Sequence, residues 1–237
     1  MINWRLEQYP ELGSTSDEVI KRAQAGEPAG LAVLALRQTA SRGSRGRSWT
    51  APVGNLNLSI LLRPDCPMGR AGLFSLLAGI AVIEALQSLG AQNLSLKWPN
   101  DIICQSAKLA GVLIDVSAQA GRIEWLTLGI GVNLAAAPEI PGRLTTSLAA
   151  QSLAITPEMA ARAILTWLEV WSAASARSIS QTWLEHGHAL GTELNIAYAG
   201  RQLTGNFAGL SASGELLLQC ENRVEIINTG EVLLAGG

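Results

Sequence analysis

The chain has 237 residues, of which 48% are apolar and 15% are charged, as expected for a globular protein without long disordered segments. This length allows one large hydrophobic core, or a main domain with a small second one. The net charge of −2 and the isoelectric point near 5.8 argue against a general nucleic-acid-binding protein, which would normally be basic.

The first predicted helix begins at Ser14, where hydroxyl side chains can cap it and acidic residues occupy its first turn. It ends near Gly26. The apolar run Leu31–Arg37 predicts a strand. Apolar and polar residues alternate at the start of Asn55–Leu62, which predicts a second strand with one buried face.

The longest apolar stretch, Ala71–Leu89, has helical periodicity and carries Glu84. We therefore expect a core helix over Leu73–Leu89 rather than a membrane span. Further strands are predicted over Leu94–Trp98, Lys108–Val116 and Glu124–Val132, and a further helix over Pro157–Ser178.

After Gly191 the pattern changes to short alternating segments separated by glycines. The predicted strands there are Glu193–Tyr198, Leu203–Leu210, Glu215–Cys220 and Val224–Ile227. The chain is therefore divided into a main domain, residues 1–190, and a small all-β domain, residues 191–237.

The three cysteines are widely spaced and form no CxxC pair, so we expect neither a disulfide framework nor a zinc site. A reduced, cytoplasmic setting follows from that pattern. No apolar run follows the N-terminus, so no signal peptide is predicted.

The segment Ser41–Trp49 combines two glycines with Arg42, Arg45 and Arg47. Glycine lets the backbone approach a ligand closely, and arginine offers planar donors suited to carboxylate or phosphate. The segment therefore predicts an anion-binding loop with Trp49 as an apolar wall. A solvated basic loop, or one that contacts nucleic acid, stays open on these residues alone.

Three further motifs follow the loop. The sequence KWPND at Lys97–Asp101 places a lysine, an amide and a carboxylate around a proline bend, which is also compatible with an ordinary turn. In KLAG, Lys108 enters an apolar strand, where its ammonium needs a partner, and Gly111 would let a ligand lie flat. The strand GIGVN is thinned by two glycines and ends in Asn133.

In this order, over nearly the whole chain from about Ser14, the motifs resemble those of the biotin protein ligase family. The resemblance implies an α+β fold with a mixed, largely antiparallel sheet, as in class II synthetase-like biotin ligase domains, followed by a small SH3-like β-barrel. It also implies a two-step reaction. Biotin and ATP form biotinyl-5′-AMP, and a lysine of a biotin carboxyl carrier protein of acetyl-CoA carboxylase then accepts the biotin.

The resemblance also implies roles for single residues. Lys108 would bridge the biotin carboxylate and the α-phosphate, with Arg42 and Asp101 as further catalytic residues. Asp101 would orient or deprotonate the acceptor lysine, or lie near a Mg²⁺ ion that arrives with ATP; no metal ligand is assigned with certainty. The biotin-binding set is Ser14, Thr15, Gln38, Arg42, Ser44, Lys108 and Gly111. The ATP- or adenylate-binding set is Arg45, Arg47, Trp49, Lys97, Asn100 and Asn133.

Three serines depart from the family pattern. Ser41 stands where glycine is common, Ser44 where arginine is common, and Ser16 where asparagine often follows Ser-Thr. The segment before the Ser-Thr cap is too short for a helix-turn-helix. We therefore expect no nucleic-acid or membrane partner, and a homodimer is left open.

Two alternatives compete with this interpretation. Lipoate ligases and octanoyl transferases share the catalytic fold, but we expect them to lack the glycine- and arginine-rich loop. A nucleic-acid-binding protein would be basic and would expose aromatic residues on its barrel. The acidic isoelectric point and a tail with only Tyr198 and Phe207 as aromatic residues argue against it.

Overall fold

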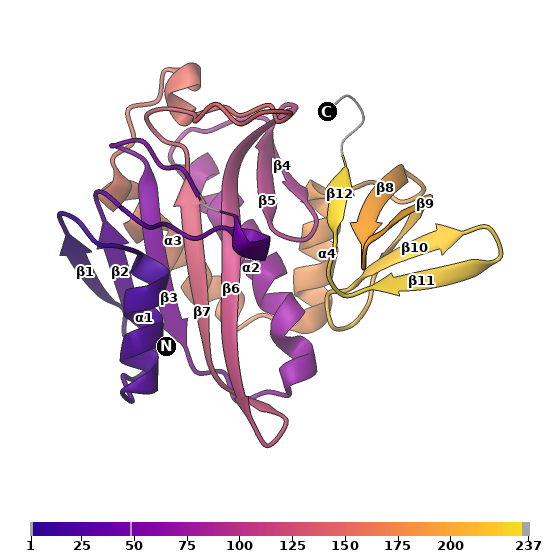
Figure 1. Cartoon of the computed structure of the whole chain (residues 1–237), viewed down its shortest axis with the longest axis horizontal. Coiled ribbons are helices and arrows are strands. Elements are labelled where there is room, and N and C mark those ends of the chain that lie inside the picture. Colours follow the sequence, from indigo (N-terminus) through magenta and orange to yellow (C-terminus); the bar gives the residue numbers. More distant parts are fainter. Residues whose placement is uncertain (1, 48, 234–237) are drawn as a thin grey trace.

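The computed structural model describes residues 2–47 and 49–233, with the side chain of Arg45 outside the description. Within these residues it has a seven-stranded and a five-stranded sheet (Figure 1). The strands of the larger sheet are β1 (Arg5–Tyr9), β2 (Leu31–Ala35), β3 (Leu56–Leu62), β4 (Leu94–Lys97), β5 (Asp101–Cys104), β6 (Ala107–Gln119) and β7 (Arg122–Val132). Their order is β1-β2-β3-β7-β6-β5-β4, and β1 and β2 are parallel, whereas the other neighbours are antiparallel. The predicted mixed, largely antiparallel sheet is confirmed.

Helices cover both faces of the larger sheet. Helix α1 (Thr15–Gln24) lies on one face, and α2 (Ala71–Ser88), α3 (Pro157–Ser172) and α4 (Ala176–His186) lie on the other (Figure 1). All five residues of β2 are buried as a result. Leu31 and Val33 belong to the core under α1, whereas Ala32 and Leu34 belong to the core under α2 and α3.

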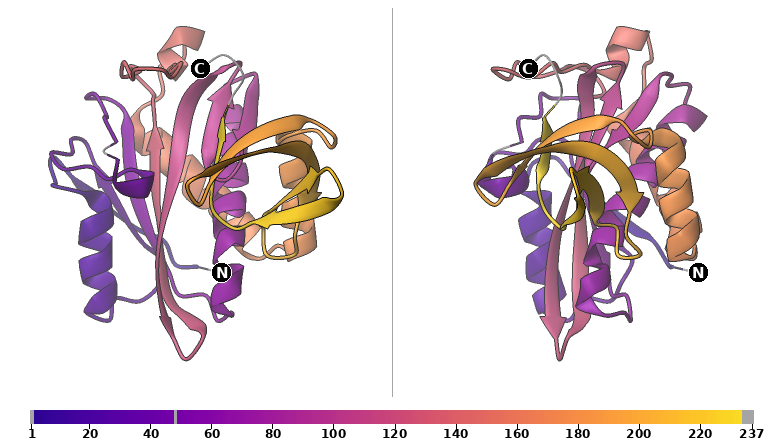
Figure 2. Two further views of the ribbon diagram at one scale, coloured as in Figure 1. Left: turned by 45° about the vertical axis from the view of Figure 1, so that its right-hand side comes forward. Right: turned by 90° about the vertical axis from the view of Figure 1, so that its right-hand side faces the viewer.

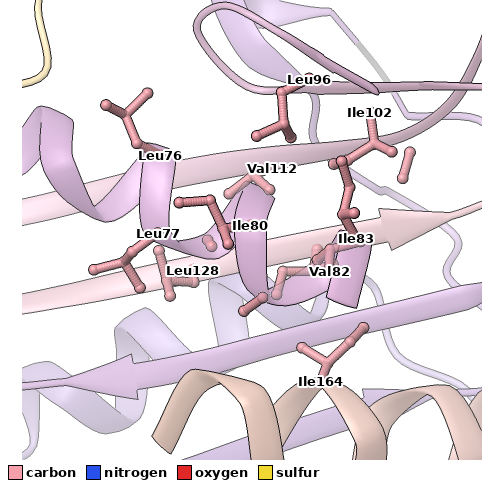
Figure 3. Close-up of a cluster of buried hydrophobic side chains, with 14 of the residues drawn as sticks. Leu76, Leu77, Ile80, Val82, Ile83, Leu96, Ile102, Val112, Leu128 and Ile164 are labelled. Carbon is pink, nitrogen blue, oxygen red and sulfur yellow. The ribbon is translucent and has the colours of Figure 1, made fainter. Parts of the chain in front are cut away.

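Helix α2 fills the space between the sheet and the other two helices of its face. Its apolar side chains pack against Leu96, Val112 and Leu128 of the sheet and approach Ile164 of α3 (Figure 3). In the described part of the chain, Met68–Ser88 is the one helical stretch long and apolar enough to cross a membrane, and most of it is buried inside the protein. The predicted core helix is confirmed.

The second sheet is formed by the C-terminal part of the chain. Its strands are β8 (Glu193–Tyr198), β9 (Arg201–Leu210), β10 (Leu216–Cys220), β11 (Arg223–Ile227) and β12 (Glu231–Leu233). They are ordered β11-β10-β9-β8-β12 and curl strongly into a small barrel-like unit beside β4 and α4 (Figure 2). The domain limits 1–190 and 191–237 stay a prediction.

Trp98, which follows β4, joins the two sheets. Its side chain is 2% exposed, and its indole Nε1 donates to the carbonyl of Gly214 in the turn before β10, at 3.2 Å. Its backbone N–H points to Nε2 of His188, at 3.4 Å. His188 in turn packs against the rings of Trp183 and Phe207.

Several predicted bounds were wrong. The predicted helix Pro157–Ser178 is two helices, because the Ser175 hydroxyl accepts from the backbone N–H of Ser178 and caps α4. Strands β1, β5 and β12 were not predicted. Strand β6 runs on to Gln119, three residues beyond the predicted end at Val116.

Candidate active site

A pocket opens on the α1 face of the larger sheet, between the N-terminus of α1 and the segment Ser41–Trp49. Strands β3, β6 and β7 form its floor. It is lined by Thr15, Ser16, Gln38, Arg42, Ser44, Trp49, Asn57, Leu58, Ser59, Asn100, Lys108, Gly111, Val112, Leu113, Gly129, Ile130 and Gly131. The predicted biotin-binding residues lie here, except Ser14.

One end of the pocket is a network of hydroxyl and amide side chains. The Thr15 hydroxyl lies 2.8 Å from that of Ser59, and the Ser16 hydroxyl lies 3.1 Å from it. The Gln38 carbonyl oxygen accepts from the Thr15 backbone N–H at 2.7 Å, and the Gln38 amide donates to Asn57 at 3.0 Å. These groups offer fixed donors and acceptors to a small polar ring.

Ser14 has a different role. Its side chain is 6% exposed and accepts from the backbone N–H of Asp17, so it is the N-cap of α1. It therefore positions Thr15 and Ser16 rather than lining the pocket.

Glycines keep the floor of the pocket flat. A Cβ on Gly129 would lie 2.7 Å from the Ser16 hydroxyl, and a Cβ on Gly131 would lie 2.5 Å from the Trp49 indole. Both distances are shorter than any normal contact, so no side chain fits at these positions without movement. Trp49 thus stacks directly on β7, and its ring centroid lies 5.4 Å from Nζ of Lys108.

Lys97, Asp101 and Lys108 form a charged cluster beside the other end of the pocket, and Lys108 is the member of this cluster that lines the pocket. Nζ of Lys108 lies 2.5 Å from Oδ1 of Asp101, and Nζ of Lys97 lies 3.8 Å from Oδ2. The three side chains are only 10–18% exposed. Burial lowers the pKa of Lys97, partly offset by the Asp101 carboxylate. Two ammonium groups share one carboxylate, which leaves one net positive charge to attract an anion.

The backbone around the cluster holds these groups in place. Asn100 donates from Nδ2 to the Val112 carbonyl at 2.6 Å, which ties the end of KWPND to β6. Lys108 donates from its backbone N–H to the carbonyl of Leu144 at 2.8 Å. Asn133 is buried, and its amide donates to the carbonyl of Thr146 at 3.0 Å. Asn133 therefore supports the wall behind the site and does not line the pocket.

The described arginines of the loop are paired with carboxylates. Arg42 binds Asp115 of β6 and Asp17 of α1. Arg47 binds Glu231 of β12, to which Arg143 also binds. The second sheet thus reaches the loop through Glu231. The side chain of Arg45 lies outside the described part of the structure, so its role in binding ATP stays a prediction.

Some residues of the site were not assigned a role from the sequence, although Ser16 was noted as a departure from the family pattern. Ser16, Asn57 and Ser59 line the polar end, and Asp115 holds the loop. The signal for Asn57 and Ser59 was the alternation in β3, which puts polar side chains on one face of an otherwise apolar strand. Asp115 is the one charged residue in the run Leu109–Val116.

The site contains few oxygen ligands for a metal. In the described part of the chain no group of three or more His, Cys, Asp or Glu side chains could hold a metal ion. Both oxygens of Asp101 face ammonium groups. Mg²⁺ is usually held by one or two carboxylates together with substrate phosphates, so the described residues do not fit a Mg²⁺ site of their own.

Residues 12–133 match the profile of the biotin/lipoate A/B protein ligase family, and residues 189–234 match the biotin protein ligase C-terminal domain. The chain belongs to this family. The biotin–[acetyl-CoA-carboxylase] ligase of Paracoccus denitrificans is 33% identical over 236 residues, covering 94% of this chain and 98% of that protein. The ligase of the same name from Mycobacterium tuberculosis is 30% identical over 243 residues, covering 97% and 89%.

Solved structures are similar over the same extent. The biotin protein ligase of Aquifex aeolicus in complex with biotin and ATP has a TM-score of 0.78 and 28% identity, covering 97% of each chain. The expected family, the α+β fold and the C-terminal ligase domain are thereby confirmed.

Proposed function

We propose that this chain is a biotin–protein ligase. It activates biotin with ATP to biotinyl-5′-AMP and then transfers biotin to a lysine of a biotin carboxyl carrier domain of the acetyl-CoA carboxylase type. The observation that carries the proposal is the buried Lys97–Asp101–Lys108 cluster beside one end of a pocket whose other end is a polar side-chain network. Relatives named for this activity, and one structurally similar ligase bound to biotin and ATP, support it.

In the first step a carboxylate oxygen of biotin attacks the α-phosphorus of ATP. The new P–O bond forms as the bond to pyrophosphate breaks. Two anions must approach each other, so fixed positive charge lowers the barrier chiefly through electrostatics and positioning. Lys108 is the residue placed for this task, since its ammonium lies inside the pocket and is held by Asp101 at 2.5 Å.

The polar end of the pocket is the proposed site for the ureido ring of biotin. A cyclic urea presents one carbonyl acceptor and two N–H donors. Thr15, Gln38, Asn57 and Ser59 offer hydroxyl and amide groups that can meet both kinds of atom. Gly111, Gly129 and Gly131 line the same pocket as Trp49, and the fused ring of biotin is proposed to lie beside Trp49.

In the second step the amine of the carrier lysine attacks the carbonyl carbon of the mixed anhydride, and AMP leaves. The lysine must lose a proton to become a nucleophile. Asp101 is the carboxylate bound to Lys108, which lines the pocket, and we propose that Asp101 both holds Lys108 and orients the incoming amine. Mg²⁺ acts as a companion of ATP in this proposal, held mainly by the phosphates.

Biotin-dependent exchange of pyrophosphate into ATP tests the proposal, because it needs only the first step. Purified protein with Mg²⁺, ATP and biotin should give exchange without any carrier. Folded protein that is inactive with biotin but active with lipoate or octanoate would overturn the assignment in favour of the related acyl ligases. The names of the relatives favour biotin.

A reduced, cytoplasmic setting is also proposed, on the ground that Cys66, Cys104 and Cys220 are free thiols. A homodimer stays a prediction, which sedimentation of the purified protein with and without biotin would test.

A further inference from the structure

Arg42 is engaged by two carboxylates instead of facing the pocket with a free charge. Its Nη2 lies 2.8 Å from Oδ1 of Asp115, and its Nη1 lies 3.3 Å from Oδ2 of Asp115. The same Nη1 lies 3.1 Å from Oδ1 of Asp17 in the first turn of α1. The pair with Asp115 is therefore bidentate, and its hydrogen bonds raise the pKa of Arg42.

Asp115 is set beside the wall of the pocket. On β6, Gly111 and Leu113 line the pocket, and Asp115 follows on the same face because side chains alternate along a strand. It lies about 7 Å beyond Leu113 at the usual rise of a strand. Its side chain is 21% exposed, so the charge there needs a partner.

The group around Arg42 and the lysine cluster differ in net charge. One guanidinium meets two carboxylates at Asp115 and Asp17, so this group carries a net negative charge. Lys97 and Lys108 share the single carboxylate of Asp101 and keep a net positive charge. A ligand anion is therefore drawn to the lysines, and Arg42 contributes by holding the loop in place.

We infer that Asp115 is a positioning residue for the ligase reaction. By binding Arg42 it holds the first part of the segment Ser41–Trp49 against the edge of the pocket. Closure over the acyl-adenylate then depends on an ion pair within the protein. The inference rests on the proposed function, and it concerns the retention of the intermediate rather than its formation.

The experiment first measures biotin-dependent exchange of pyrophosphate into ATP by the wild-type protein. If the wild type gives no exchange, the proposed function fails and this inference fails with it. With exchange established, Asp115→Asn should speed dissociation of biotinyl-AMP about 3- to 10-fold, the effect of about 0.7–1.4 kcal/mol. The KM for biotin should rise over the same range, with kcat for exchange within twofold of wild type. Tryptic cleavage within the loop should also become faster.

A matched control is available in the pair of Arg37 with Glu11, which is exposed, has a 2.7 Å contact and lies outside the pocket lining. Glu11→Gln should leave the off-rate, the KM and the cleavage rate unchanged. Arg42→Gln should speed dissociation of biotinyl-AMP and cleavage of the loop at least as much as Asp115→Asn does, because it also removes the contact with Asp17. The double variant should add less than twofold to Arg42→Gln, because both substitutions remove the Arg42–Asp115 pair.

An unchanged off-rate in Asp115→Asn, an equal change in Glu11→Gln, or full additivity in the double variant would each overturn the inference. If Asp115→Asn lowers the melting temperature, the off-rate of Arg42→Gln tests the inference instead. Arg42→Gln removes the same ion pair from the loop, and the Arg42 side chain is 38% exposed.

Discussion

Asp101→Asn removes the one negative charge between two buried ammonium groups while keeping the size of the side chain. The Lys108 contact is 2.5 Å and the Lys97 contact is 3.8 Å. At an effective dielectric constant of about 20, charges about 4 Å apart attract by about 4 kcal/mol. Breaking a buried pair by removing one partner typically costs about 3–5 kcal/mol. Because the lysines keep 12% and 18% exposure, we expect about 3 kcal/mol of lost stability at pH 7.

The loss should depend on pH in a defined direction. Burial already lowers the pKa of Lys97, and Asp101 opposes that shift. Without the carboxylate the pKa falls further, so Lys97 loses its proton at a lower pH in the folded variant than in the unfolded chain. The loss of stability caused by Asp101→Asn is therefore greatest below the pKa of Lys97 in the folded variant, and it becomes smaller as the pH rises above that pKa. Urea unfolding at pH 7 and at pH 9.5 measures both values.

The two half-reactions give an independent readout. If Asp101 acts on the acceptor lysine, Asp101→Asn should reduce transfer to carrier more than adenylation. If it serves Mg²⁺ or the nucleotide, both steps should fall equally. A stability loss below about 1 kcal/mol at pH 7, or a loss that widens toward pH 9.5, would refute the charge-cluster reasoning.

Three further predictions concern single positions. Lys108→Ala should slow biotinyl-AMP formation by about 10²-fold or more, the scale of losing one charge-stabilising group, and a near-normal rate would exclude its catalytic role. Ser44→Arg adds a charge-assisted bond of about 1.5–3 kcal/mol to the bound anion, so it should slow the escape of biotinyl-AMP by about one to two powers of ten. Equal off-rates, measured on trapped complexes, would show that the other arginines already suffice. Burial lowers the pKa of His188 from 6.5 to about 4, so the unfolded chain takes up the proton first as pH falls. Stability should therefore decline between pH 6.5 and pH 4, by at most about 3 kcal/mol, and His188→Gln should flatten that part of the unfolding profile.

The parts of the site that local patterns encode were predictable. The Ser-Thr pair at the start of α1, the glycines of β7 and Gly111 of β6 each follow from spacing within a few residues. The Lys108–Asp101 contact could not be predicted in this way, although the two residues are close in sequence. It depends on the register of β5 against β6, which shifts at a bulge between Ile102 and Ile103.

Other contacts of the site could not be predicted because they join residues that are far apart in the sequence. Arg42 and Asp115 are far apart in the chain, and no local pattern connects a loop arginine to a particular strand carboxylate. The same holds for Arg47 and Glu231, which meet only because the second sheet packs beside the first. The break between α3 and α4 was missed because apolar periodicity continues through it, while the cap at Ser175 is a single side chain.

The position of Trp98 limits which substitutions the protein can accept. This one residue is bonded to Lys97 on one side and is held through its ring by the turn at Gly214 on the other. Gly72 of α2 also meets that turn so closely that an added methyl group would lie 2.9 Å from the Ser213 carbonyl. Substitutions that move Trp98 also move the neighbouring backbone of Lys97, and therefore disturb the lysine cluster. A substitution on one side of this junction is therefore expected to need a compensating change on the other side.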